Sequence, residues 1–302
     1  MCQYEGDTIA ATPAGSTQLR PYRPVFTWND PRMQKPAEVY SPGQQPDQAD
    51  PAFADWQKNE AYQKGEYVML MRRRAVLATI YRLYPQAAHA VGSASPFGGG
   101  PYKEMTGWAD GKGTSCTHTN PKVVRNATGN QLLAGAYDIA PAPGWQDKDK
   151  NWHPATTGHP AWVLHAKGKL PSVGDSYILT GSKAQDGEKS YGRFLHVGTV
   201  VHVDVSADGV FWITADGGQN EIYTKGQAAH LVRREFKCMT NMPSMPNAPH
   251  FSGGAEGDIK RLYGWLDISD PRVTFDQAAL DLPSLDSDYR QCGAWIERAR
   301  AG

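Results

Sequence analysis

The chain has 302 residues, of which 40% are hydrophobic, so it is long enough to bury a core in one large domain or two small ones. Its 31 basic and 31 acidic side chains cancel, and a net charge of zero gives no long-range attraction to nucleic acid or acidic lipid. No apolar run approaches the roughly 18 residues that a membrane span needs, so we expect neither a nucleic-acid partner nor a membrane span.

The N-terminal sequence MCQYEGDTIAATPAG has neither the basic segment nor the apolar segment of a secretory signal peptide. We therefore expect synthesis in the cytoplasm and export by a non-classical route. Residues 1–50 are rich in Pro, Gln, Asp and Ala and have no sustained helical or strand period, which predicts an extended N-terminal arm. Residues 51–302 are expected to form one folded domain.

Residues 55–84 carry apolar side chains at helical spacing. The pattern predicts either one long helix or two helices that meet near Gly65. The apolar face consists of Val68, Leu70, Met71, Val76, Leu77, Ile80 and Leu83.

A glycine-rich connection over residues 91–113 leads to a second predicted helix. Thr114 or Ser115 stands where an N-cap would begin that helix, whereas Pro121 has to end it or restart it at a first turn. Residues 131–169 are rich in Trp and Pro and have no clear period, so we expect an insertion or a covering loop.

Beyond residue 170 the chain changes to short segments rich in β-branched and aromatic residues. The predicted strands are DSYILTG (175–181), FLHVGTVVHVDV (194–205), GVFWITADGG (209–218), HLVRREF (230–236) and RLYGWLDI (261–268). The segment 288–301 predicts a closing helix. Helices followed by antiparallel strands favour an α+β architecture over a βαβ one.

The segment HVGTVVHVD alternates like a strand but begins with a histidine. Strict alternation places Val197, Thr199, Val201 and Val203 on one face, suited to a core, and places His196, Gly198, Val200 and His202 on the other. We expect Gly198 to leave open space beside the imidazole of His196, so that a reacting group can approach it. We interpret His202 as a structural or surface residue.

Asp216 ends the following predicted strand, which returns after a turn containing Asp208 and Gly209. A loop of five residues places Asp216 opposite Gly198, on the face of His196, at a diagonal of roughly 7–8 Å between backbones. A loop shorter by one residue would turn Asp216 away. Gln219 is the substitute partner of His196 if the register differs.

Cys116 follows small polar residues at the predicted start of the second helix. A helix N-terminus lowers the pKa of a thiol, and its free N–H groups can bind a developing oxyanion. Cys116, His196 and Asp216 therefore form a candidate nucleophile, base and orienting residue for acyl transfer. Each has a simpler interpretation as well: a core thiol, a partly buried histidine and a turn residue.

The order of these motifs resembles the NlpC/P60 and CHAP branch of the papain-like cysteine peptidases. The matching positions are Cys116, the pair Gly174-Asp175 that opens a strand, His196-Val197-Gly198, and Asp216, within roughly residues 105–236. The gap between the cysteine and the Gly-Asp strand is longer than is usual in that family. By the same resemblance Trp108 or Tyr102 is the upstream aromatic near the oxyanion site, and we expect Trp108, Ser115 and Gln219 to contact substrate.

The resemblance implies a papain-like hydrolase that cleaves amide bonds in peptidoglycan stem peptides through a thioester, without a cofactor. Together with the missing signal peptide, it suggests an antibacterial effector carried by a contractile secretion machine, or a phage-type lysis protein, that acts in a target-cell periplasm. An effector implies an immunity protein in the producing cell and a loading role for the N-terminal arm.

Two other functions remain open at this stage. A deamidase or transglutaminase-like toxin uses the same Cys-His-Asp geometry, and a binding module on the same scaffold would keep Cys116 as an inert thiol. The spacing of His153, His159 and His165 fits neither a helix nor a strand, so we expect no metal site. Cys238 and Cys292 are interpreted as two free thiols, with a disulfide as the alternative in an oxidising compartment.

Overall fold

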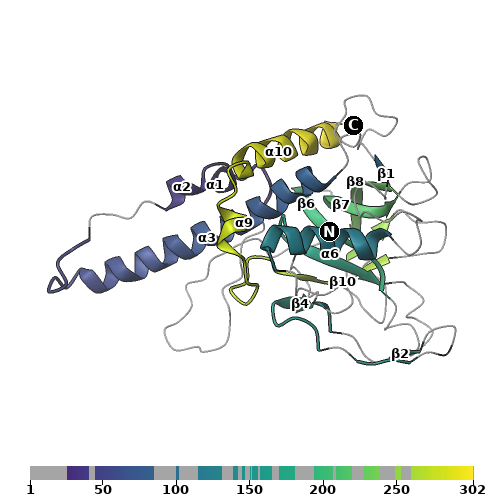
Figure 1. The fold of residues 1–302 in the computed structure, drawn as a ribbon, viewed down its shortest axis with the longest axis horizontal. Coiled ribbons are helices and arrows are strands. Elements are labelled where there is room, and N and C mark those ends of the chain that lie inside the picture. The colour runs from purple at the N-terminus through teal and green to yellow at the C-terminus, as the bar shows by residue number, and fades with distance from the viewer. Residues whose placement is uncertain are drawn as a thin grey trace.

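The computed structural model describes the chain in separate stretches of well-placed residues. These are residues 26–40, 45–84, 100–101, 115–130, 139–141, 145–146, 150, 152–155, 157–164, 170–180, 194–206, 209–219, 228–238, 249–252 and 260–301. The helices are α1 (Pro31–Gln34), α2 (Pro36–Val39), α3 (Phe53–Leu83), α6 (Ser115–Thr128), α9 (Gln277–Leu280) and α10 (Leu285–Ala301). The strands are β1 (Gly100–Pro101), β2 (Trp145–Gln146), β3 (Trp152–His153), β4 (Trp162–Leu164), β5 (Ser176–Thr180), β6 (Phe194–Ser206), β7 (Gly209–Gln219), β8 (Ala228–Cys238), β9 (Pro249–Ser252) and β10 (Lys260–Leu266). Helices combined with an antiparallel sheet confirm the expected α+β class (Figure 1).

The main sheet has eight strands, in the order β1-β8-β7-β6-β5-β10-β4, with β9 beside this path. β9 pairs with β8 on one side and with β10 on the other, so the strands from β5 to β10 close into a barrel. The closure involves residues 235–238 of β8 and residues 260–261 of β10, at one end of the barrel. Its inner face carries a buried cluster made of Leu170, Tyr177, Leu179, Val200, Val203, Trp212, Leu262 and Trp265.

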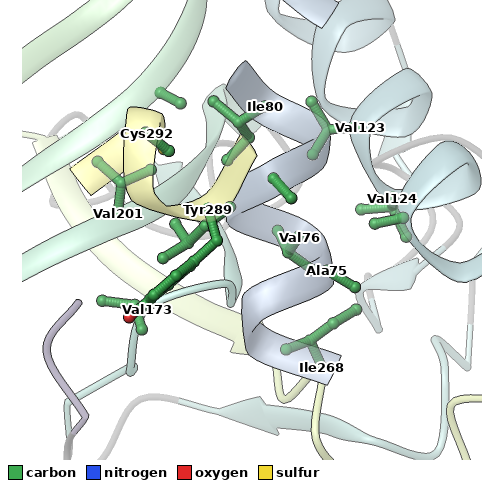
Figure 2. Packing of buried hydrophobic residues seen from close by; sticks show 14 of the residues in the cluster. Ala75, Val76, Ile80, Val123, Val124, Val173, Val201, Ile268, Tyr289 and Cys292 are labelled. Carbon is green, nitrogen blue, oxygen red and sulfur yellow. The ribbon is translucent and has the colours of Figure 1, made fainter. Parts of the chain in front are cut away.

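Helices α3, α6 and α10 cover the outer face of the sheet, and the main hydrophobic core lies between them and the strands. Figure 2 shows Val201 of β6 next to Cys292 of α10, and Ile80 of α3 between this pair and Val123 of α6. The barrel therefore has two apolar environments, one inside it and one beneath the helices. The site described below lies where they meet.

Helix α3 is continuous over 31 residues, so the alternative of two helices meeting near Gly65 is wrong. Strong helix formers surround Gly65, and a Cβ at this position would find no heavy atom within 4 Å. The N-terminal half of α3 is largely exposed and extends past the sheet in Figure 1. Its C-terminal half is held by core packing.

Helix α6 also continues through a residue that was expected to interrupt it. Pro121 lies inside α6 and removes one backbone hydrogen bond. The helix persists because Val123, Val124 and Ala127 pack into the main core. Thr114, one of the two expected N-caps, lies outside the described residues.

Residues 26–40 fall in the segment that the sequence assigned to an extended arm, yet they pack into the domain. Phe26 and Met33 are fully buried in the main core. The backbone N–H of Phe26 donates to Ser172 Oγ (2.9 Å), and the N–H of Val173 donates to the carbonyl of Phe26 (3.1 Å). Within the expected insertion 131–169, β4 pairs with β10 and so extends the sheet.

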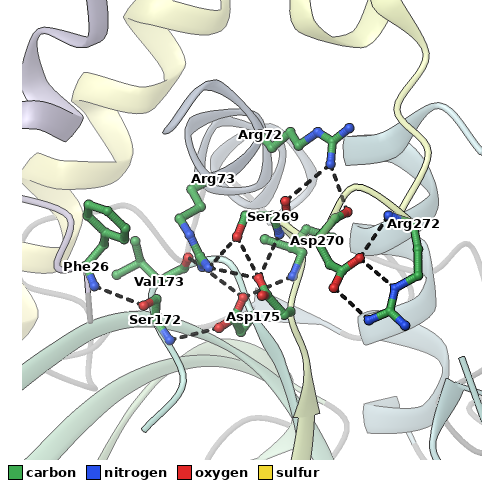
Figure 3. Close-up of polar contacts among 11 residues, drawn as sticks. Phe26, Arg72, Arg73, Ser172, Val173, Asp175, Ser269, Asp270 and Arg272 are labelled. Carbon is green, nitrogen blue, oxygen red and sulfur yellow. Dashed lines mark hydrogen bonds and ion pairs between the residues drawn. The ribbon is translucent and has the colours of Figure 1, made fainter. Parts of the chain in front are cut away.

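A buried arginine on α3 joins the helix layer to the sheet (Figure 3). The guanidinium of Arg73 donates from Nη1 to Asp175 Oδ1 (2.8 Å) and to the carbonyl of Val173 (2.6 Å). From Nη2 it donates to Asp267 Oδ1 (3.1 Å) and to Ser269 Oγ (3.0 Å). One side chain thus connects α3 to the start of β5 and to the end of β10.

Asp175 belongs to the Gly-Asp motif that the resemblance singled out, and its role here is structural. Its carboxylate also accepts the N–H groups of Ser172 (2.8 Å) and Ile268 (3.1 Å). Burial raises the pKa of Asp175 to about 7, while Arg73 opposes that rise and Asp267 adds to it. Gly174 has a φ of +89°, a backbone conformation that favours glycine in the turn before β5.

Replacing Arg73 by Met should lower the free energy of unfolding by about 3–5 kcal/mol, because it leaves a buried carboxyl group without its cation. The loss should grow as the pH rises through about 7, because Asp175 begins to ionise there and the variant must keep its carboxyl neutral. Urea unfolding of both proteins at pH 6 and pH 8 measures this. Arg82→Met is the control on the same helix, since its side chain is 31% exposed and its ion pair with Asp288 spans 3.6 Å. A loss equal to that of the control would contradict the structural role of Arg73.

Candidate functional site

His196 and Asp216, the expected base and orienting residue, lie together in the structure. The distance between His196 Nε2 and Asp216 Oδ2 is 3.0 Å, and their side chains are 4% and 0% exposed. In the neutral imidazole, a hydrogen on Nε2 that faces a carboxylate leaves Nδ1 as the basic nitrogen. The pair is therefore arranged as an oriented base.

Five residues form one row across the barrel at this level. Trp265, Tyr177, Gly198, Asp216 and His230 are directly paired in that order, from β10 through β5, β6 and β7 to β8. The row crosses the barrel away from the end that β9 closes. Sequence reasoning missed the register position of His230, because it depends on the pairing of β7 with β8.

A β-bulge in β6, rather than a loop of five residues, sets the register between β6 and β7. Ser206 pairs with Gly209, and unbroken pairing from there would set Asp216 opposite Thr199. The register shifts between Val200 and His202, so that Val201 is an extra residue and Asp216 pairs with Gly198. A β-bulge thus produces the predicted juxtaposition.

Because of this bulge, β6 does not follow the strict alternation that the sequence predicted. His202 pairs with Ile213, whose side chain lies in the main core beneath the helices, and Val203 pairs with Trp212 in the inner cluster. His202 therefore does not share the face of His196. It is buried, and its Nε2 lies 3.1 Å from Asp204 Oδ2, which agrees with a structural role. Burial lowers the pKa of His202, and Asp204 opposes that effect.

Gly198 does not leave the open space that the sequence suggested. A Cβ at Gly198 would collide with Asp216 Oδ1 and would approach the ring and hydroxyl of Tyr177 to 2.9 Å. The carboxylate and the phenol meet directly over this residue. Gly198 is required because two side chains from the neighbouring strands fill the space above it.

Two tyrosines that the sequence did not single out hold Asp216. The hydroxyl of Tyr177 lies 2.9 Å from Asp216 Oδ1 and 3.1 Å from Oδ2. The hydroxyl of Tyr84, at the C-terminal end of α3, donates to the backbone carbonyl of Asp216 (3.3 Å). Tyr177 lies in the predicted strand 175–181, but its contact with Asp216 depends on how that strand pairs with β6, which no local pattern specifies.

Cys116 lies in the first turn of α6 and is 8% exposed. It packs in a small cluster with Ala140, Ile178 and Val197. Val197 follows His196 in the chain, and alternation sends the two side chains to opposite faces of β6. The thiol of Cys116 therefore contacts β6 at Val197, the residue that follows His196.

Asn120, one turn after Cys116, fixes α6 against the two strands of the site. Its Nδ2 lies 3.0 Å from Ser176 Oγ, 3.0 Å from Thr199 Oγ1 and 3.1 Å from the carbonyl of Gly198. Asn120 is itself buried. This amide sets the position of the N-terminus of α6 relative to His196, and the sequence analysis did not identify it.

The remaining expected contacts with substrate are only partly described. Trp108 and Tyr102 lie outside the described residues. Ser115 begins α6 and Gln219 ends β7, and the structure describes their backbone but not their side chains. The residue that pairs with His196 is Asp216, the first of the two expected partners.

Cys292 offers a contrast to Cys116. It is a free thiol in the middle of α10, where burial raises its pKa, so it remains in the unreactive thiol form. The side chain of Cys238, the other member of the alternative disulfide, lies outside the described residues. Within the described stretches, no group of three or more His, Cys, Asp or Glu side chains is placed to hold a metal ion.

No family model, no curated protein and no solved structure matches this chain. In the parts of the chain that the structure describes, no helix has the length and apolar character to cross a bilayer.

Substituting Gly198 by Ala should destabilise the protein by about 1–3 kcal/mol, because the new methyl group must displace Asp216 or Tyr177. It should also separate Asp216 from His196, which imidazole ¹⁵N chemical shifts would report. Gly65→Ala is the matched control, since the same methyl group meets open space on an exposed helix and should stabilise by about 0.5–1 kcal/mol. Equal effects of the two substitutions would contradict the close packing over Gly198.

Proposed function

We propose that the protein is a cysteine hydrolase with papain-like chemistry, in which His196 is the base, Asp216 orients it and Cys116 is the nucleophile. The observation that supports this most directly is the buried pair of His196 Nε2 and Asp216 Oδ2 at 3.0 Å. An imidazole held in this way is a general base with a defined tautomer. The thiol at the start of α6, which packs against Val197 next to His196 in the chain, is the nucleophile that we assign to this base.

The proposed reaction begins when Nδ1 of His196 accepts the proton of the Cys116 thiol. The thiolate adds to the carbonyl carbon of an amide, and backbone N–H groups at the start of α6 stabilise the oxyanion. The imidazolium then donates its proton to the leaving amine, and a thioester remains on Cys116. Water, deprotonated by the same imidazole, hydrolyses the thioester and restores the thiol.

The positions of the two residues set a requirement for this reaction. Cys116 packs on the face of β6 that carries Val197, whereas His196 shares the inner face with Asp216. The thiol and the imidazole therefore have to meet around the start of β6. There the pairing of β5 with β6 contains a second irregularity, which leaves Leu195 unpaired immediately before His196. Bulges of this kind redirect side chains next to active sites.

The proposed substrate is the peptide part of peptidoglycan, and the support for it is the resemblance of Cys116, Gly174-Asp175, His196-Val197-Gly198 and Asp216 to the NlpC/P60 and CHAP enzymes. A helix that starts with the cysteine and packs on an antiparallel barrel is compatible with a papain-like fold. On this proposal the protein is an antibacterial effector that acts in a target-cell periplasm.

Purified peptidoglycan incubated with the wild-type protein should release new stem-peptide fragments, detected by mass spectrometry. Cys116→Ala should lower the rate by about 10⁶-fold, because it removes the nucleophile. Cys292→Ala is the matched control, since it removes the other described thiol and should retain activity.

Iodoacetamide labelling of Cys116 separates the outcomes of this experiment. Rapid labelling at neutral pH that slows in His196→Ala, without any peptidoglycan fragments, would favour a protein deamidase or transglutaminase-like toxin. Labelling of Cys116 at the same rate with and without His196 would refute the proposed pair of nucleophile and base.

The proposed target also predicts where the protein is toxic. Directed to the periplasm of a bacterium that lacks an immunity protein, the wild type should lyse the cells, whereas cytoplasmic expression should be tolerated. Growth curves and microscopy measure this, with Cys116→Ala as the inactive control. Equal tolerance in both compartments, at matched protein levels, would argue against a wall target.

A further inference from the structure

Asp216 is a carboxylate in a costly environment. Its side chain is fully buried, and it lies on the inner face of the barrel with Val200, Trp212 and the other apolar residues of the inner cluster. Removing a carboxylate from water favours its protonated form. A protonated Asp216 would no longer be a pure acceptor for the Nε2 hydrogen of His196, so the site needs a second group that favours the ionised carboxyl.

Tyr177 supplies such a group. Its hydroxyl reaches both oxygens of Asp216, at 2.9 Å and 3.1 Å. Its ring packs edge-on against Trp212, with centroids 5.5 Å apart, and lies 6.3 Å from the ring of His196. Since Tyr177 is fully buried between these neighbours, its hydroxyl has a fixed direction.

Tyr84 provides an internal comparison on the opposite side of the same residue. Its hydroxyl donates to the backbone carbonyl of Asp216 and not to the carboxylate. Burial, and then the charge of Asp216, raise the pKa of Tyr84 well above 10, so it remains a protonated donor. The two tyrosines thus each donate one buried hydrogen bond to Asp216, but only that of Tyr177 touches the charge.

We infer that Tyr177 is a positioning residue of this site, which keeps Asp216 ionised and fixes the carboxylate oxygen that faces His196. The inference deepens the proposed function, and it rests on that function only for the role of His196 as a base. The observation that supports this inference is the contact between the Tyr177 hydroxyl and the Asp216 carboxylate above Gly198.

The direction of the effect follows from the groups that face Asp216. These are Tyr177 from β5, His196 from β6 and Tyr84 from α3. In the strand register, the backbone of His230 in β8 pairs with that of Asp216. A donor to a carboxylate stabilises most the state in which the neighbouring imidazole is neutral, because the negative charge is then uncompensated. Without the phenol hydroxyl, the pair of His196 and Asp216 should hold its shared proton to higher pH.

The test uses the full-length protein labelled with ¹⁵N-histidine, as wild type, Tyr177→Phe and Tyr84→Phe. The pH midpoint of the His196 imidazole titration is read by NMR, with the resonance assigned by its absence in His196→Gln. Tyr177→Phe should raise the midpoint by about one pH unit, and Tyr84→Phe should leave it unchanged. Urea unfolding should show that both variants lose a similar free energy of about 1–2 kcal/mol.

An unchanged midpoint in Tyr177→Phe, or an equal change in both variants, would overturn the inference and leave Tyr177 as a packing residue. The readout requires no substrate, so it remains interpretable if peptidoglycan is not cleaved. In that case a raised midpoint would support the role of Tyr177 while the proposed function fails. If the wild type does cleave peptidoglycan, the acid limb of its rate profile should move by the same amount in Tyr177→Phe.

Discussion

The guanidinium of Arg73 is the contact on which the arrangement of helices and strands depends. It reaches the turn before β5 through Val173 and Asp175, and the segment after β10 through Asp267 and Ser269. These two segments neighbour each other in the sheet, since β5 pairs with β10. Because the buried guanidinium binds acceptors on both segments, it fixes the position of α3 along the barrel. The position of α3 in turn places Tyr84 next to Asp216.

The local parts of this fold could be predicted from the sequence, and the closure of the barrel could not. Segments with a clear period of two became β5, β6, β7, β8 and β10, because alternation is a property of a few consecutive residues. β9, with the sequence PHFS, is too short to show a period, yet it closes the ring. The persistence of α6 through Pro121 also depends on packing against distant residues, which no local pattern contains.

The candidate site divides in the same way. The pairing of His196 with Asp216 was predictable because both belong to one hairpin, although the bulge at Val201 replaced the expected loop length. Tyr177 could not be predicted, since it reaches Asp216 from another strand across the residue that separates them. Gly198 was recognised as special for the wrong reason. The missing side chain makes room for the protein itself rather than for an incoming group.

The two strands at the ends of the sheet path have a consequence for the behaviour of the protein in concentrated solution. β1 has two residues, one of which is a proline without an N–H group, and β4 has three. Unpaired backbone groups along a strand are the template on which a second chain adds by hydrogen bonding. Ends this short offer a second chain few hydrogen bonds, so they limit growth of the sheet between molecules.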